Sequence, residues 1–217
     1  MFRDRSEAGH ELARHLAHYA GCPDVIVLAL PRGGAPVAFA LAADLRVPMD
    51  LFLVRKLGVP WQPELAMGAV ASGGVRVIAR DVVRTCGITE EQIERASAEQ
   101  NAVLQQNERI LRNGRPAPNL NARIAILVDD GLATGSTMRA AIAAVRAQQP
   151  QRIVVAVPVG AESTCTQLRQ EVDEMVCAST PEPFWAVGQW YADFSPVSDQ
   201  EVRELLARSD QATRSVA

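Results

Sequence analysis

The stretch Ile124-Ala-Ile-Leu-Val-Asp-Asp-Gly-Leu-Ala-Thr-Gly-Ser-Thr-Met138 decides the fold that we expect for this chain. Its five leading apolar residues predict a buried strand that ends at Asp129 and Asp130. The segment from Gly131 to Gly135 has no regular period, and the alanine-rich sequence from Ser136 onward favours a helix. The stretch therefore predicts a unit of strand, loop and helix.

The loop of this unit has the composition of a phosphate-binding site. Glycines let backbone amides converge without obstruction by a Cβ atom, and the first turn of a helix leaves its amides unpaired. Thr134, Ser136 and Thr137 add hydroxyl donors. Asp129 and Asp130 would repel a phosphate and prefer hydroxyl groups or a metal ion. A ribose 5-phosphate has a diol and a phosphate at opposite ends, so it satisfies both halves of the stretch.

Other sites share parts of this pattern. A Walker phosphate loop requires Gly-Lys-Ser/Thr, but Ser136 directly follows Gly135. A receiver-domain aspartate also lies at a strand end, but that interpretation gives the Thr-Gly-Ser-Thr run no role. No Gly-x-Ser-x-Gly motif surrounds Ser136, which disfavours a serine hydrolase. A buried strand with two capping carboxylates and no ligand is the remaining alternative.

The whole pattern resembles the phosphoribosyl-diphosphate (PRPP) signature of the type I phosphoribosyltransferases, in which an apolar strand and an acidic pair precede Thr-Gly-x-Thr. By this resemblance Asp129 and Asp130 are catalytic residues that hold the ribose hydroxyls. Mg²⁺ is the implied cofactor, with the same two aspartates as weak ligands, directly or through PRPP. The residues that would wrap the 5-phosphate are Ala133, Thr134, Gly135, Ser136 and Thr137.

A second strand, loop and helix unit begins earlier in the chain. The apolar run from Asp24 to Leu30 predicts a buried parallel strand, and the sequence after Pro36 predicts a helix. Between them lie Arg32, Gly33 and Gly34. In the family, a loop at this place grips the pyrophosphate, commonly through a non-proline cis peptide. A plain tight turn is the alternative for this short motif.

A third strand, Met49 to Val54, is expected to deliver Arg55 and Lys56 to its carboxyl end. Adjacent basic residues suit a doubly charged leaving group, so we expect both to bind pyrophosphate and to act in catalysis. The family often has Arg-Lys here, ahead of a mobile loop that closes over the substrate. Leu57 to Glu64 is interpreted as that loop, and a solvated surface is the alternative for the basic pair.

The middle of the chain predicts a hairpin and a long helix. Ala66–Ser72 and Val75–Ile78 flank Gly73-Gly74, which is typical of a hairpin. Thr89 and Gln92 form a capping-box pattern for a polar helix that ends near Arg112. This helix carries no obvious chemistry, and a dimer surface and a strut are both open interpretations.

The C-terminal third completes an α/β fold. The runs 152–158 and 174–177 predict strands and 162–172 predicts a helix, so the chain is expected to form a Rossmann-like parallel sheet flanked by helices. Ligands of such sheets lie beyond the carboxyl ends of the strands, where the three loops fall. We expect one domain over 1–217, with a final helix to about Arg208 and a frayed tail over 209–217.

Half of the aromatic residues of the chain, five of ten, lie between Thr180 and Pro196. Flat apolar rings suit stacking on a planar heterocycle. In the family a variable hood covers the acceptor, usually a nucleobase, and the resemblance places the hood over 180–196. An aromatic plug that seals the sheet edge is the alternative. The acceptor-binding residues expected from the resemblance are Phe184, Trp185, Trp190, Tyr191 and Asp193.

The composition restricts the class of ligand. A formal charge of −3 disfavours a nucleic-acid surface, and the chain has no apolar run of the roughly 20 residues that cross a bilayer. Its four cysteines are scattered, which fits reduced thiols, and no signal peptide is recognised, so we expect a cytoplasmic protein. The expected partners are PRPP, a small-molecule acceptor and a second copy of the chain in a homodimer, with no nucleic acid and no membrane.

The resemblance implies transfer of the phosphoribosyl group from PRPP to a nitrogen acceptor, with release of pyrophosphate. The acceptor stays open: Ala133 stands where 6-oxopurine enzymes carry an acidic residue and is similar to the adenine enzymes. Glu64 and Asp193 are candidates for acid or base chemistry near it. The pattern looks most like a group of bacterial phosphoribosyltransferases without an agreed acceptor. A PRPP- or nucleotide-binding regulator that performs no transfer is the alternative function.

Overall fold

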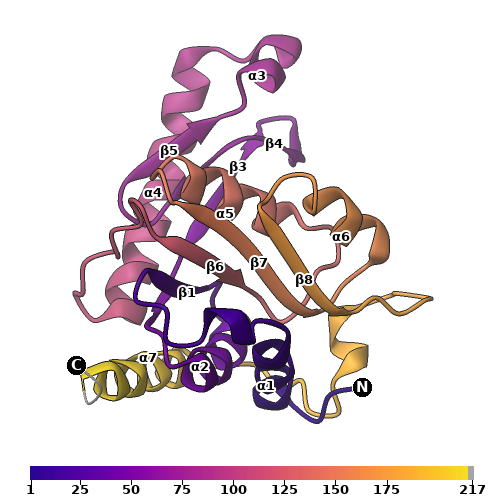
Figure 1. Cartoon of the computed structure of the whole chain (residues 1–217). Helices are drawn as coiled ribbons and strands as arrows, with labels where there is room; N and C mark the ends of the chain where they lie inside the picture. Colours follow the sequence, from indigo (N-terminus) through magenta and orange to yellow (C-terminus); the bar gives the residue numbers. More distant parts are fainter. Residues whose placement is uncertain (215–217) are drawn as a thin grey trace.

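A five-stranded parallel sheet forms the centre of the molecule, in a computed structural model that describes residues 1–214 (Figure 1). Its strand order is β2-β1-β6-β7-β8, and each neighbouring pair is parallel. This confirms the predicted parallel α/β sheet. The strands are β1 (Val25–Ala29), β2 (Met49–Leu51), β6 (Ile124–Val128), β7 (Arg152–Val159) and β8 (Glu174–Ser179).

Helices cover both faces of this sheet (Figure 1). On β1, Val27 faces a core shared with Leu12 and Leu41, whereas its neighbour Leu28 faces a second core shared with Ile142. This alternation follows from the two-residue period of a strand, and burial on both faces explains the continuous apolar runs of the sequence. The helices of the first face are α1 (Arg5–His15), α2 (Gly34–Leu45) and α7 (Asp199–Arg214), and those of the second are α5 (Ser136–Arg146) and α6 (Glu162–Leu168).

The third predicted strand divides into two elements of different sheets. β2 ends at Leu51, and β3 (Val54–Val59) begins a three-stranded antiparallel sheet with β4 (Gln62–Ala71) and β5 (Val75–Ile78). Arg55 and Lys56 therefore lie inside β3 rather than at the end of a parallel strand. The segment 57–64 is not an irregular loop, because most of it belongs to the β3–β4 hairpin, with Gly58 paired to Ala66. The predicted β4–β5 hairpin is confirmed.

A long helix packs against this smaller, antiparallel sheet. α3 (Arg80–Cys86) precedes α4 (Glu90–Arg112), whose N-terminus has the predicted capping box between Thr89 and Gln92. α4 packs against β3, β4 and α7. Its last residue, Arg112, is 1% exposed and pairs with Asp50 of β2 at 2.8 Å. The helix is therefore anchored to the edge strand of the parallel sheet.

Several helix boundaries differ from the predicted ones. The sequence favours Ser6 as the cap of a first helix, but the cap of α1 is Asp4, whose carboxylate accepts from the Glu7 amide. α6 ends at Leu168, four residues before the predicted end at Val172, and the short helix η1 (Ala17–Tyr19) follows α1. α7 extends to Arg214, so the prediction of a frayed tail is wrong for 209–214, and residues 215–217 lie outside the described part of the chain. Among the described residues, no helix is long and apolar enough to cross a membrane.

Replacement of Arg112 by methionine is expected to destabilise the fold by about 3–5 kcal/mol, because it leaves the Asp50 carboxylate buried without its partner. Urea unfolding of the purified variant measures this loss. The exposed Arg109 on the same helix offers the control, since Arg109→Met should change stability by less than about 0.5 kcal/mol. Equal stability of the two variants would show that the buried pair does not anchor α4.

Candidate active site

The two carboxylates of the acidic pair lie at the carboxyl end of β6, the middle strand of the parallel sheet. The loop after β1 packs directly on them. A Cβ atom added to Gly33 would come within 2.1 Å of the Asp130 carboxylate, and one on Gly34 within 2.6 Å of the Val128 carbonyl. The paired glycines are therefore required for close approach of the two loops.

Asp129 is held in an environment that disfavours its charged form. Burial raises the pKa of its carboxyl group from 3.8 to about 8, and the charge of neighbouring Asp130 adds to this effect. The Asp130 amide donates a 2.9 Å hydrogen bond to Asp129 Oδ1, which opposes the shift only partly. Near neutral pH, the acidic pair therefore retains a proton on Asp129.

Arg5 is the partner of Asp130 and was not among the residues predicted from the sequence. Its Nε donates to Asp130 Oδ2 at 2.9 Å, and the two side chains are only 11% and 15% exposed. Burial raises the pKa of Asp130, and the contact with Arg5 opposes that shift. No motif surrounds Arg5, and the positive charge reaches the site only because α1 begins beside the loop after β6.

The same guanidinium joins the acidic pair to the segment 180–196. Arg5 Nη1 donates to the Ser195 carbonyl at 2.9 Å, and the charged group lies 3.9 Å from the centre of the Phe194 ring. The Tyr191 hydroxyl donates a 2.6 Å hydrogen bond to the Asp130 carbonyl. The segment predicted as a hood thus makes one contact with Asp130 and two with its partner Arg5.

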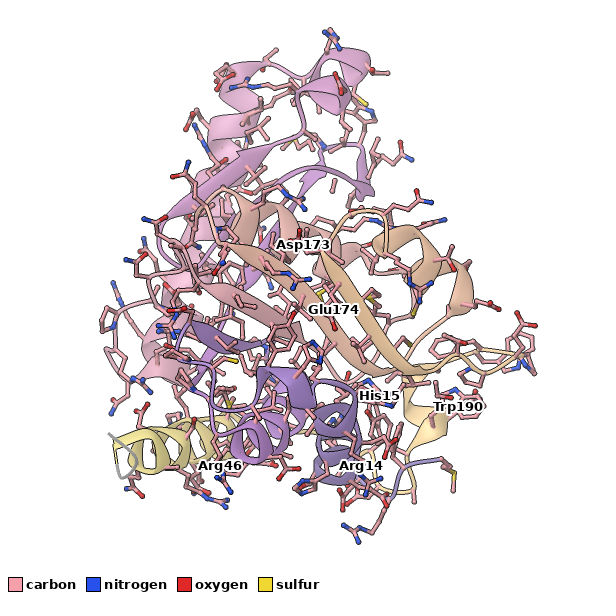
Figure 2. All side chains as sticks on the ribbon, viewed as in Figure 1. Arg14, His15, Arg46, Asp173, Glu174 and Trp190 are labelled. Carbon is pink, nitrogen blue, oxygen red and sulfur yellow. The ribbon has the colours of Figure 1, made fainter. Side chains whose placement is uncertain are left out.

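The aromatic residues of this segment have different surroundings. Tyr191 is 5% exposed and packs with Phe2, so its ring is part of the core rather than a free stacking surface. Trp185 is 77% exposed, and Phe184 is half-buried. Trp190, in η2 (Val187–Trp190), lies beside the N-terminal segment, where its carbonyl accepts from the Phe2 amide (Figure 2).

The remaining acceptor candidate, Asp193, is exposed and belongs to a local turn. Its carboxylate accepts from the backbone amide and the hydroxyl of Ser195. These hydrogen bonds lower the pKa of Asp193, so the group stays ionised. An ionised carboxylate can accept a proton or a hydrogen bond but cannot act as an acid.

The loop between β6 and α5 presents unpaired amides. Gly135 has a φ of 71° and caps α5 without a side-chain hydrogen bond. Thr164 Oγ1 donates a hydrogen bond to the Ala133 carbonyl, and Arg139 Nη1 donates one to the Thr134 carbonyl. These two hydrogen bonds fix the position of the loop. Among the described residues, no group accepts from the amides of residues 133–137. This arrangement of donors at a helix N-terminus suits a phosphate.

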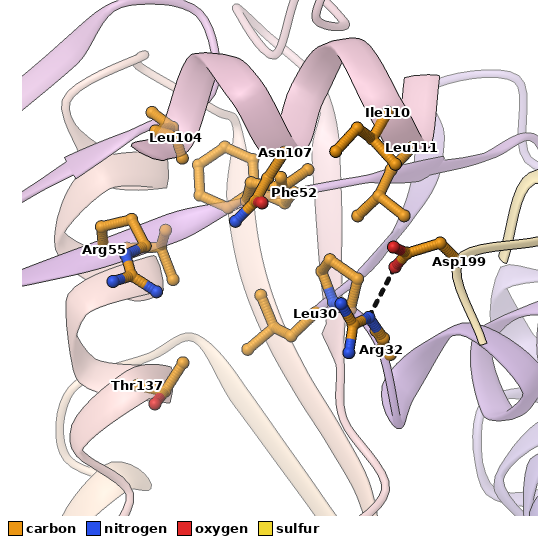
Figure 3. Close-up of a pocket in the computed structure, with 13 residues that line it drawn as sticks. Leu30, Arg32, Phe52, Arg55, Leu104, Asn107, Ile110, Leu111, Thr137 and Asp199 are labelled. Carbon is orange, nitrogen blue, oxygen red and sulfur yellow. Dashed lines mark hydrogen bonds and ion pairs between the residues drawn. The ribbon is translucent and has the colours of Figure 1, made fainter. Parts of the chain in front are cut away.

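A cavity of about 330 Å³ adjoins this loop and connects the predicted phosphate and pyrophosphate residues (Figure 3). Arg32, Arg55 and Thr137 line it together. The peptide bond between Pro31 and Arg32 is cis, as in the loops that the resemblance suggested. Arg32 Nε lies 2.6 Å from a carboxylate oxygen of Asp199, at the start of α7.

Lys56 does not line this cavity. Consecutive strand residues point to opposite faces, so Arg55 and Lys56 diverge once both lie in β3. Lys56 Nζ lies 3.3 Å from the carboxylate of Glu64 across the hairpin. The expectation that the two basic residues act as one pair is therefore not met by the described geometry, and a leaving-group role for Lys56 stays a prediction.

Comparison with known proteins agrees with this geometry. A family model described as "Phosphoribosyl transferase domain" matches residues 6–194. The chain belongs to this family. Two Mycobacterium tuberculosis proteins, each named "Putative phosphoribosyl transferase", are 45% identical to it over 209 residues, or 96% of this chain and 47% of each relative. The chain thus spans about half the length of these curated relatives.

A solved structure of similar length shares the family fold. The crystal structure of the protein TT1426 from Thermus thermophilus is 41% identical to this phosphoribosyl transferase domain, with a TM-score of 0.88. The match covers 96% of this chain and 98% of the other. These findings confirm the family resemblance inferred from the signature stretch and leave the acceptor unassigned.

The raised pKa of Asp129 predicts a pH dependence of stability. Between pH 3.8 and about 8, Asp129 is protonated in the folded state but ionised in the unfolded chain. The free energy of unfolding should therefore fall as pH rises through this range. Asp129→Asn should remove this decline and be more stable than the wild type at pH 8. Urea unfolding across that range tests the effect, with the exposed Asp81→Asn as a control that should keep the wild-type slope.

The pairing of Arg5 with Asp130 predicts a coupling energy of about 1–3 kcal/mol between the two side chains. Arg5→Met should be strongly destabilising, since it leaves a largely buried carboxylate without its cation. Asp130→Asn should lessen the cost of Arg5→Met in the double variant. Urea unfolding of all four proteins completes the cycle, and strict additivity would contradict a direct interaction.

Proposed function

We propose that this phosphoribosyl transferase domain transfers the 5-phosphoribosyl group from PRPP to a nitrogen acceptor. The single observation that carries the proposal is the β6–α5 turn, which has carboxylates at one end and unpaired amides at the other, beside an arginine-lined cavity. PRPP carries a diol between a 5-phosphate and a 1-pyrophosphate, so one molecule has a group for each of these three features. Family membership supports the same assignment.

In this proposal the ribose and its phosphate occupy the two ends of the turn. The amides of residues 133–137 and the hydroxyls of Thr134, Ser136 and Thr137 donate to the 5-phosphate. Asp129 and Asp130 bind the ribose hydroxyls.

The pyrophosphate leaves into the cavity lined by Arg32 and Arg55. The C1–O bond to pyrophosphate breaks, the bond from C1 to the acceptor nitrogen forms, and the nitrogen loses its proton to a base or to water. Negative charge grows on the departing oxygen, so the two guanidinium groups stabilise the transition state more than the bound substrate. Their position in one cavity supports this role.

Mg²⁺ held near Asp129 and Asp130 would supply a further positive charge to stabilise the departing pyrophosphate. Within the described residues, no cluster of three or more metal-ligating side chains exists. Asp129 and Asp130 offer oxygen ligands of the type that Mg²⁺ accepts. Asp130 already accepts from Arg5, so PRPP and water would provide most of the coordination.

The acceptor is proposed to be a planar nitrogen heterocycle held between helix α6 and the hood. A cavity of about 820 Å³ at this place is lined by Phe184, Ser163 and Gln167, among others. Phe184 and the exposed Trp185 remain candidates for stacking, whereas Tyr191 is proposed to position the hood. A homodimer and a cytoplasmic location are part of the proposal.

Turnover is tested by incubating the protein with PRPP, Mg²⁺ and a panel of nucleobases while pyrophosphate release is measured. We expect release with at least one base. Asp129→Asn combined with Asp130→Asn should lose PRPP binding by calorimetry while the protein stays folded. Wild-type PRPP binding without release on any acceptor would instead favour a regulatory protein, and unchanged affinity of the double variant would remove the proposed ribose site.

A further inference from the structure

Helix α4 forms one wall of the cavity that contains Arg32 and Arg55 (Figure 3). The sequence showed no chemistry for this helix, but four of its residues line the cavity. Three of them are apolar and one is an amide, and their spacing places them on one helical face. They are Leu104, Asn107, Ile110 and Leu111.

The amide of Asn107 is directed into this cavity. Figure 3 shows it extending from α4 toward the space between Arg55 on one side and Arg32 on the other. Asn107 is half-buried, and its side chain has no hydrogen-bond partner among the described residues. An amide in such a place can offer two N–H donors and a carbonyl to a ligand.

The charges around the cavity favour an anion. Arg32 and Arg55 contribute two positive charges and Asp199 one negative charge, which leaves a net charge of +1 on the lining. Asp199 pairs with Arg32 at 2.6 Å. Arg55 Nε instead donates to the neutral side-chain oxygen of Gln100, at 3.1 Å, so α4 orients this guanidinium without neutralising it. The uncompensated positive charge is therefore that of Arg55, whose guanidinium group contacts α4.

We propose that Asn107 binds the pyrophosphate group of PRPP directly, so that α4 is a fixed cover of the pyrophosphate site. This inference rests on the proposed function and assigns a role to a helix that the signature motifs do not include. The cavity volume of about 330 Å³ suits a small ligand. Leu104, one turn before the amide, is 3% exposed and gives the leaving group an apolar wall.

The test compares pyrophosphate with ribose 5-phosphate, which lacks the leaving group. Asn107→Asp keeps the shape of the side chain but places a negative charge in the cavity, so the affinity for magnesium pyrophosphate should fall by at least about tenfold. Asn107→Ala should lower it by a smaller factor, about threefold or more, because one hydrogen bond is lost. Both variants should bind ribose 5-phosphate within about twofold of the wild type. Isothermal titration calorimetry measures each affinity.

Gln106→Glu is the matched control, since it makes the same amide-to-carboxylate change on an exposed neighbour of α4. It should bind both ligands like the wild type. Wild-type pyrophosphate affinity in both Asn107 variants overturns the role of Asn107, as does equal weakening of the two ligands or an equal effect of Gln106→Glu. Failure of the wild type to bind either ligand would instead overturn the proposed function itself.

Discussion

The active-site region depends on one electrostatic constraint: two adjacent carboxylates lie at the end of a strand that is buried on both faces. β6 is the middle strand of the sheet, and its apolar residues leave Asp129 and Asp130 at the margin of the core. Burial disfavours a negative charge on either carboxylate, and the charge of Asp130 further disfavours one on Asp129. The fold resolves the conflict by retaining a proton on Asp129 and by pairing Asp130 with Arg5.

This pairing organises segments that are far apart in the chain. Arg5 begins α1, the Gly33 loop packs on the Asp130 carboxylate, and the segment 180–196 contributes Tyr191 and Ser195. Each contact is made to Asp130 or to its counter-ion. A ligand that donates hydrogen bonds to the Asp130 carboxylate would therefore act on the N-terminal helix and the hood together. In the proposed function, binding of the ribose and covering of the acceptor would be linked through this one residue.

The lobe formed by β3, β4, β5 and α4 has a different relation to the sheet. It brings Arg55 to the cavity from an antiparallel hairpin, while α4 forms a wall of the same cavity (Figure 3). The buried pair of Arg112 and Asp50 fixes the end of α4 against β2. The proposed pyrophosphate site therefore combines a loop of the parallel sheet with a lobe whose position depends on that anchor. A fixed helix such as α4 can exclude water from a leaving group, as a closing loop does in other sites.

The sequence by itself determined the parallel sheet, the paired glycines, the acidic pair and the open loop after β6, because each depends on a local pattern. A five-residue apolar run predicts a buried strand, and an unpaired helix N-terminus predicts an anion site, wherever the rest of the chain lies. The capping box of α4 was predictable for the same reason. These features are encoded within a few residues of one another.

Only the tertiary structure decided which charged groups meet. Arg5 is 125 residues from Asp130 in sequence and carries no motif, so their pairing depends on the packing of α1 beside the sheet. Arg55 and Lys56 look equivalent in the sequence, but alternation within β3 separates them. The surroundings of Tyr191 and Asn107 also depend on long-range packing. The Tyr191 ring is buried in the core, and the Asn107 amide faces a cavity. Long-range packing determines which side chains are buried and in which direction they point, and local sequence patterns specify neither.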